Sequence, residues 1–199
     1  MIFAGKSFMN EAVKKIESIF VLKHNILLDA FRPALKTNKG GCQFNENFKN
    51  WRASIFVVDM LIYLRAEHPD RHFGITSKQA WDMFTSKFLD ADPSDNRLEL
   101  LSIFKDCVKV VDNDSVSKLS LDESLFVISD TLYTSDKYNP VLISNTKDEK
   151  EKAELFYNAK GKKVDVPFII LDAVKTEEYL RALYPVQSAL IDKNSLFKR

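Results

Sequence analysis

The chain has 199 residues, of which 45% are hydrophobic and 29% charged, the balance of an ordinary globular protein. The formal net charge of +1 excludes a global basic field, so any nucleic-acid contact would need a local patch. The two cysteines, Cys42 and Cys107, form no CxxC pair, so we expect a reducing, cytoplasmic setting and no disulfide framework. No run approaches the roughly 18 apolar residues of a membrane span, and the N-terminus carries charges too early for a secretory signal.

The first half of the chain begins with short elements and then a long loop. We predict a helix at 7–17, a buried strand at 18–22, a helix that begins with Ile26 and is ended or kinked by Pro33, and a loop at about 33–48. The apolar stretch 51–66 is compatible with a strand that passes into a helix. An amphipathic helix is predicted at 76–89.

The second half alternates helices with strands. The predicted elements are helix 98–107, strand 108–112, helix 121–133, strand 140–144, helix 148–161, strand 166–172 and helix 175–184, with a weakly structured tail after Pro185. This alternation predicts an α/β fold over a single domain, 1–199. We expect three layers, α-β-α, around a mainly parallel central sheet.

Polar residues follow two of the predicted strands. Lys23, His24 and Asn25 come directly after the first strand, and Ser144, Asn145 and Thr146 end or follow the strand at 140–144. In parallel α/β sheets, sites form just outside the carboxyl ends of the strands. The helix that begins at Asp122 is expected to abut the same edge.

These segments resemble the PIN family of nucleases over about residues 18–180. In that family the first strand ends in a hydrophobic-Asp-Thr-Asn motif followed by an apolar helix. Here the segment is FVLKHNILLDAF, which matches at Asn25 but has Lys23 at the aspartate and His24 at the threonine.

Two further segments carry the resemblance. A later family strand ends in Thr-Asn-Asp; here LISNT matches with Ser144 and Asn145 and has Thr146 at the aspartate. A helix between these motifs begins with an aspartate, matched by Asp122 in LDESLFVIS. The acid of an early helix would be Asp59, where the family has a glutamate.

The resemblance implies RNA hydrolysis by Mg²⁺ or Mn²⁺ held on three or four carboxylates. This sequence keeps Asp59 and Asp122 as catalytic candidates, loses two acids and places a cation at one of the lost positions. We therefore expect Lys23 to form an ion pair with Asp122, Asp59 or both, and no metal cofactor. Asp148 is the residue that could restore metal binding through a local rearrangement.

Two functional classes follow. In the first, the domain is a pseudo-nuclease that binds a protein partner or an RNA without cleaving it. In the second, it is an active metal-dependent endoribonuclease, of the toxin–antitoxin or phage-defence type, with Asp59, Asp122 and Asp148 as metal ligands. A third reading is an unrelated α/β protein.

Each residue also has a plainer interpretation. Lys23 would be a solvent-facing lysine at a strand end, Asn25 the N-cap of the following helix, and Asp122 a helix-start acid that interacts only with the helix dipole. His68 and His72 are separated by Pro69, which makes a zinc site on a regular helix doubtful. The basic stretch 32–39, with Lys23 and the lysines at 14–15, is a solvated loop or an RNA-phosphate contact.

Several enzyme classes have no sequence support. The chain contains no GxxxxGK[ST], GxGxxG or GxSxG motif. It therefore gives no support for a P-loop nucleotide site, a dinucleotide-binding site or the nucleophile elbow of a hydrolase.

Overall fold

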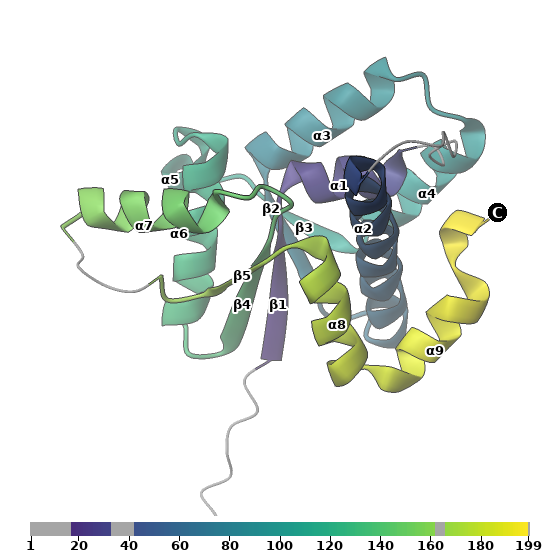
Figure 1. Ribbon diagram of the computed structural model, residues 1–199. Helices are drawn as coiled ribbons and strands as arrows, with labels where there is room; N and C mark the ends of the chain where they lie inside the picture. The colour runs from purple at the N-terminus through teal and green to yellow at the C-terminus, as the bar shows by residue number, and fades with distance from the viewer. Residues whose placement is uncertain (1–16, 33–41, 162–165, 199) are drawn as a thin grey trace, which may run out of the picture.

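The computed structural model describes residues 17–32, 42–161 and 166–198, and these form an α/β fold with three layers (Figure 1). Five parallel strands make one sheet in the order β3-β2-β1-β4-β5. The strands are β1 (Glu17–Leu22), β2 (Gly74–Ser77), β3 (Val108–Val111), β4 (Tyr138–Ile143) and β5 (Ile169–Leu171). The predicted fold class is thereby confirmed.

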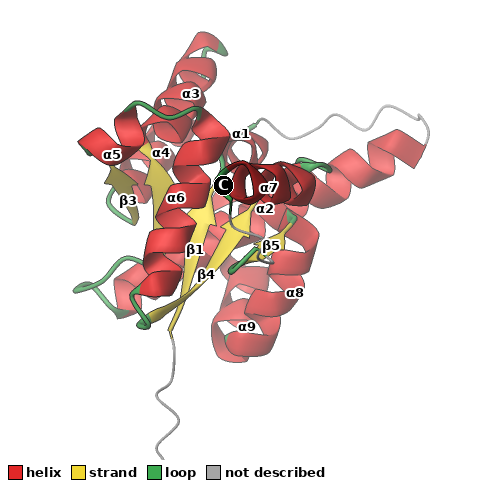
Figure 2. Ribbon diagram, turned by 90° about the vertical axis from the view of Figure 1, so that its left-hand side faces the viewer, coloured by secondary structure: helices red, strands yellow, loops and turns green. Residues whose placement is uncertain are grey.

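Helices lie on both faces of the sheet (Figure 2). They are α1 (His24–Phe31), α2 (Cys42–Glu67), α3 (Lys78–Asp90), α4 (Asp95–Lys105), α5 (Asp114–Ser117), α6 (Leu121–Thr134), α7 (Glu149–Ala159), α8 (Ala173–Leu183) and α9 (Pro185–Asn194), followed by a 3-10 turn, η1 (Leu196–Lys198). No helix among the described residues has the length and apolar content needed to cross a bilayer.

Alternating side chains of β1 build the two cores. Phe20 and Leu22 pack with α1, α2 and α8 on one face, whereas Ile19 and Val21 pack with α6 and α7 on the other. This is the period of two that a strand imposes on its side chains. Because β1 lies in the middle of the sheet, it is buried on both faces and its sequence reads as one apolar run.

Strand β1 pairs with β4 over its whole length, with Leu22 opposite Ile143. The sheet order reverses here: the chain moves from β1 to β2 and β3 on one side, then returns to β4 and β5 on the other. The carboxyl ends of β1 and β4 therefore form the switch point at which open α/β sheets usually carry a site.

Several sequence predictions in the first half of the chain need correction. The stretch 51–66 lies entirely within the long helix α2, whose apolar side chains pack against α1, α8 and α9 and against one face of the sheet. Residues 42–48 of the predicted loop also belong to α2, while 33–41 lie outside the described residues. The strand β2 was missed, because its four residues are too few to show a period.

The tail after Pro185 is a helix and not weakly structured. Pro185 occupies the first turn of α9, where a proline is well tolerated, and Ile191 is buried. Phe197, close to the end of the chain, packs its ring 5.3 Å from that of Phe31. The predicted helix at 7–17 lies outside the described residues, except that Glu17 begins β1.

Candidate functional site

Lys23 lies where β1 ends and points to the α6–α7 face of the sheet. Its backbone N–H donates to the Ile143 carbonyl at 3.1 Å, so the extended pairing with β4 continues one residue beyond the strand. The alternation that sends Ile19 and Val21 to this face sends Lys23 there as well. Only 4% of the residue is exposed, which rules out the solvent-facing interpretation.

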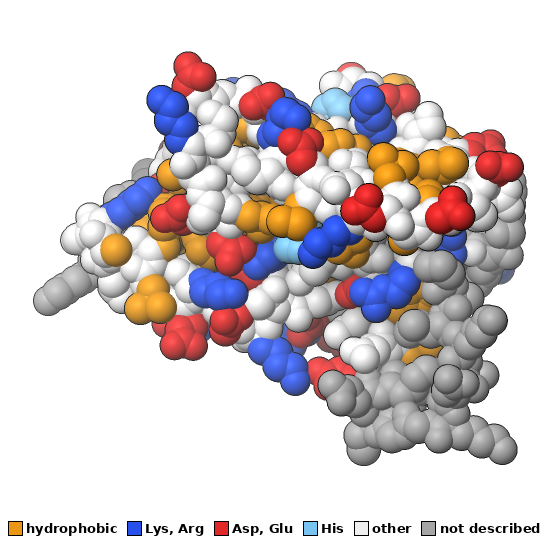
Figure 3. Space-filling model, turned by 90° about the horizontal axis from the view of Figure 1, so that it is seen from above, with side chains coloured by type: hydrophobic (Ala, Val, Ile, Leu, Met, Phe, Trp, Pro, Cys, Tyr) orange, Lys and Arg blue, Asp and Glu red, His pale blue; other side chains and the backbone are white. Residues whose placement is uncertain are grey.

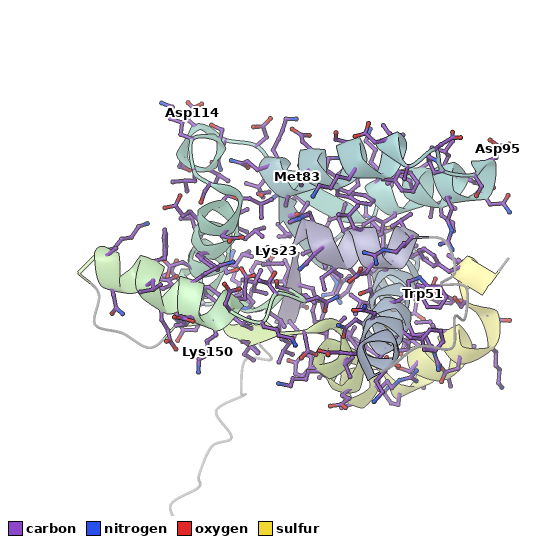
Figure 4. The ribbon with its side chains drawn as sticks, turned by 45° about the horizontal axis from the view of Figure 1, so that its top comes forward. Lys23, Trp51, Met83, Asp95, Asp114 and Lys150 are labelled. Atoms are coloured by element: carbon purple, nitrogen blue, oxygen red, sulfur yellow. The ribbon has the colours of Figure 1, made fainter. Side chains whose placement is uncertain are left out.

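Two carboxylates hold the buried ammonium group. Lys23 Nζ lies 2.6 Å from Asp122 Oδ1 and 2.6 Å from Glu149 Oε2. Asp122 stands in the first turn of α6 and Glu149 in the first turn of α7, where a helix dipole favours negative charge. The expected ion pair with Asp122 is present, and the second acid is Glu149. Figure 4 shows Lys23 at the centre of this edge, between α1 and the α6–α7 pair.

The loop after β4 binds the same carboxylate. The Ser144 hydroxyl donates to Glu149 Oε2 at 2.7 Å and accepts the Thr146 N–H at 3.1 Å. Asn25 Nδ2 donates to the Thr146 hydroxyl at 3.1 Å. Asn25 is therefore not the N-cap of α1, which is Lys23 itself; its side chain ties α1 to the β4 loop instead.

Asn145 connects three elements. Its Nδ2 donates to Asp29 Oδ2 on α1 at 2.8 Å, and its Oδ1 accepts the Ala173 N–H at the start of α8 at 3.0 Å. Asp29 also pairs with Arg32. These contacts give Asn145 a structural role: it fixes the β4 loop against helices from the opposite face of the sheet.

A second lysine closes the outer side of the cluster. Lys152 Nζ lies 3.2 Å from Asp148 and 3.7 Å from Asp122. The hydrogen bond that Lys152 donates to Asp148 raises the pKa of the Lys152 ammonium above its ordinary value. With Lys23 and Glu149, the cluster holds three carboxylates and two ammonium groups, so most of its charge is neutralised internally.

His24 lies beside the cluster as a neutral base. Burial lowers the pKa of His24 below its ordinary value of 6.5, and the positive charges of Lys23 and Lys87 lower it further, against an opposing effect of Asp122. Its Nδ1 is buried and has no hydrogen-bond partner among the described residues. The imidazole therefore adds no positive charge to the site near neutral pH.

Asp59 lies elsewhere. It is fully buried on α2, its Oδ1 accepts the Leu196 N–H at 3.3 Å, and it lines a cavity with Ile191, Ser195 and Phe197. The expectation that Asp59 shares the site with Asp122 is not met, since Glu149 takes the place beside Lys23.

The carboxylates that an active nuclease would use as metal ligands do not form a metal site in the structure. Within residues 17–32, 42–161 and 166–198, no three His, Cys, Asp or Glu side chains are placed to hold a metal ion. Asp59, Asp122 and Asp148 therefore form no such group. His68 and His72 follow the end of α2, so they do not lie on a common helix.

Glu149 and Lys152 were not among the site residues predicted from the sequence. The sequence could have predicted Glu149. It stands in the first turn of the helix that follows a strand at the switch point, and an acid at that position faces the sheet edge. Lys152 stands on the next turn of the same helix.

Comparisons of the chain with protein-family models, with curated proteins and with solved structures yield no match. The chemistry of the site thus rests on its geometry. The site consists of a buried ammonium group between two carboxylates, and these contacts join the end of β1 to the first turns of α6 and α7.

Proposed function

We propose that the chain is a PIN-like module without nuclease activity, in which the Lys23 ammonium stands where the family carries a metal ion. The observation that carries the proposal is the position of Lys23 Nζ, 2.6 Å from both Asp122 and Glu149. The module would act by binding a partner and not by cleaving RNA.

Electrostatics disfavour a cation at this point. A divalent metal would have to displace the Lys23 ammonium or lie beside it. At about 4 Å and an effective dielectric near 20, each unit of like charge costs roughly 4 kcal/mol. Mg²⁺ also needs several oxygen ligands in near-octahedral geometry, whereas Glu149 Oε2 is already shared by Lys23 and Ser144.

The topology supports the resemblance from which the proposal starts. The two strand-end motifs, after β1 and after β4, lie side by side at the centre of the sheet. The helix that begins near Asp122 reaches the same edge. A PIN-like fold would place its three motifs at these positions.

The surface around this edge favours a protein over an extended RNA. Figure 3 shows basic and acidic side chains interspersed on the coloured part of this face, with apolar side chains between them. A groove for an RNA backbone would present a stripe of Lys and Arg. Lys23 is engaged with carboxylates and is not available to a phosphate.

The second candidate, an active endoribonuclease of the toxin or phage-defence type, has less support. It needs Asp59, Asp122 and Asp148 to share Mg²⁺ or Mn²⁺, and the described residues contain no such group.

Metal binding separates the two candidates. Titration of the full chain with Mn²⁺ in a calorimeter should give no saturable heat, and incubation with single-stranded RNA and Mn²⁺ should leave the RNA intact. Lys23→Asp should gain saturable Mn²⁺ binding, because it removes the ammonium and adds an oxygen ligand beside Asp122 and Glu149.

Lys150→Asp is the matched control, because Lys150 lies on the exposed side of α7 and pairs with Glu154 outside the cluster (Figure 4). It makes the same charge change away from the site and should not create a site. Tight Mn²⁺ binding by the unmodified chain that disappears in Asp122→Asn would overturn the proposal, as would RNA cleavage lost in the same variant.

A further inference from the structure

A cavity lies at the far end of α1 from the Lys23 cluster. Its volume is about 530 Å³, within the range of small-molecule pockets. It lies between the end of α1, the end of α3, the connection to α4 and the first turn of α4, whose start is marked by Asp95 in Figure 4. The lining residues are Leu28, Phe31, Arg32, Lys87, Phe88, Ala91, Asp92, Pro93, Ser94 and Arg97.

Two of its three cations lack a counter-ion. Arg32 pairs with Asp29 at 2.7 Å, but neither Lys87 nor Arg97 has a carboxylate within ion-pair distance among the described residues. Among the residues that the structure describes, Asp92 is the one acid that lines the cavity, so these walls carry an excess of positive charge.

Arg97 is the better defined of the two. It is half-buried, its guanidinium carbon lies 5.0 Å from the centre of the Phe197 ring, and one N–H donates to the Ala30 carbonyl over a long 3.4 Å. Burial lowers the pKa of the Arg97 guanidinium below its ordinary value. A cation that loses water without gaining a carboxylate is costly, and an anion beside it would offset that cost.

The rest of the cavity is apolar. Phe31 and Phe88 are buried, and their ring centres lie 5.6 Å apart in an edge arrangement. Phe31 also packs against Phe84 and Phe104, which makes this wall rigid. Leu28 and Pro93 complete the apolar lining. Such a surface accepts a flat hydrophobic body but does not recognise charge.

We propose that this cavity binds a small phosphomonoester that carries a flat apolar or aromatic body. The phosphate would lie between Lys87 and Arg97, close to the Ser94 hydroxyl, which makes no capping hydrogen bond to α4. A phosphomonoester carries roughly 1.5 to 2 negative charges near neutral pH, which matches the two unpaired cations. The guanidinium adds a planar donor pair that fits phosphate oxygens.

The cavity is a separate site from the Lys23 cluster, although the charge of Lys87 also acts on His24 beside that cluster. Helix α1 has eight residues and separates the two by about 12 Å along its axis. No residue of the cluster lines the cavity. Ligand binding at this cavity can therefore be tested whether or not the chain binds a metal or cleaves RNA.

Calorimetry with three probes tests the proposed chemistry. Phenyl phosphate should bind the full chain at least about tenfold more tightly than inorganic phosphate or phenol, because only the ester uses both the cations and the apolar wall. Its affinity should fall as salt is raised. Equal affinities for phenyl phosphate and phenol, or no binding of phenyl phosphate at millimolar concentration, would overturn the proposal.

Two substitutions locate the site. Lys87→Gln and Arg97→Gln should each raise the dissociation constant for phenyl phosphate by about tenfold or more. Lys105→Gln, at the exposed end of α4 away from the cavity, is the matched control and should leave it unchanged. Because Arg97 also contacts Ala30 and Phe197, thermal melting checks that the Arg97→Gln variant folds. If that variant does not fold, the test rests on Lys87→Gln, since Lys87 is exposed. Unchanged affinity in Lys87→Gln would overturn the assignment.

Discussion

Lys23 and Glu149 form a buried ion pair across 126 positions of the sequence, with Nζ and Oε2 at 2.6 Å. The same oxygen accepts the Ser144 hydroxyl, while Oε1 of Glu149 is buried without a hydrogen-bond partner among the described residues. The pair joins the end of β1 to the start of α7. Lys23 is therefore the counter-ion of the buried Glu149 carboxylate, whereas the ammonium group is shared by Glu149 and Asp122.

Removal of the ammonium group should strongly destabilise the fold. Lys23→Met keeps most of the side-chain volume but leaves Glu149 as an uncompensated buried carboxylate. We expect the free energy of unfolding to fall by about 3–5 kcal/mol, measured by urea denaturation. Lys150→Met on the exposed side of α7 is the control and should change it by less than about 0.5 kcal/mol. A similar loss in both variants would contradict the assignment.

The two residues should also be energetically coupled. Glu149→Gln removes the negative charge with little change in shape, so in the Lys23→Met background it relieves a buried charge that has already lost its partner. The double variant should be more stable than the sum of the single losses predicts, by about 1–3 kcal/mol. Simple additivity in the double-mutant cycle would mean that the contact contributes nothing specific.

Stability should depend on pH through His24. The pKa of His24 in the folded chain lies below the 6.5 of the unfolded chain, so between these values the unfolded state binds more protons. The contribution of this group is therefore fully present above about pH 6.5 and is lost as the pH falls through the folded-state pKa.

His24→Gln should remove that part of the pH dependence, which urea denaturation between mildly acidic and neutral pH would measure. His68→Gln is the chemical control, because His68 is exposed at the end of α2. If His24→Gln leaves the slope of stability against pH unchanged, the imidazole is not held neutral by its surroundings.

The buried thiol of Cys107 should be unreactive in the folded protein. Burial raises the pKa of Cys107 to about 11, and its Sγ donates to the Ile103 carbonyl at 3.2 Å. The thiolate, which is the reactive form, is therefore scarce at neutral pH. Iodoacetamide labelling resolved by peptide mass spectrometry should modify Cys107 slowly in buffer and rapidly in denaturant. Equal rates in the two conditions would show that the site is open.

Local patterns predicted most of the elements for a physical reason. The apolar runs at 18–22 and 140–144 are buried on both faces of the sheet, so they are recognisable without knowledge of their neighbours. Serine at position 120 and Glu123 form a capping box that starts α6 where the acidic first turn indicated. The prediction for 51–66 was wrong because an apolar run that is buried from several sides shows neither the period of a helix nor that of a strand.

The sequence by itself determined that polar residues follow β1 and β4, and that a lysine stands where the resemblance requires an acid. Strand alternation even determines the face to which Lys23 points. Only the tertiary structure decided which acids meet it, because that depends on the angular position of α6 and α7 over the sheet. The packing of these helices brings Glu149 to Lys23, while α2 carries Asp59 into a different cavity.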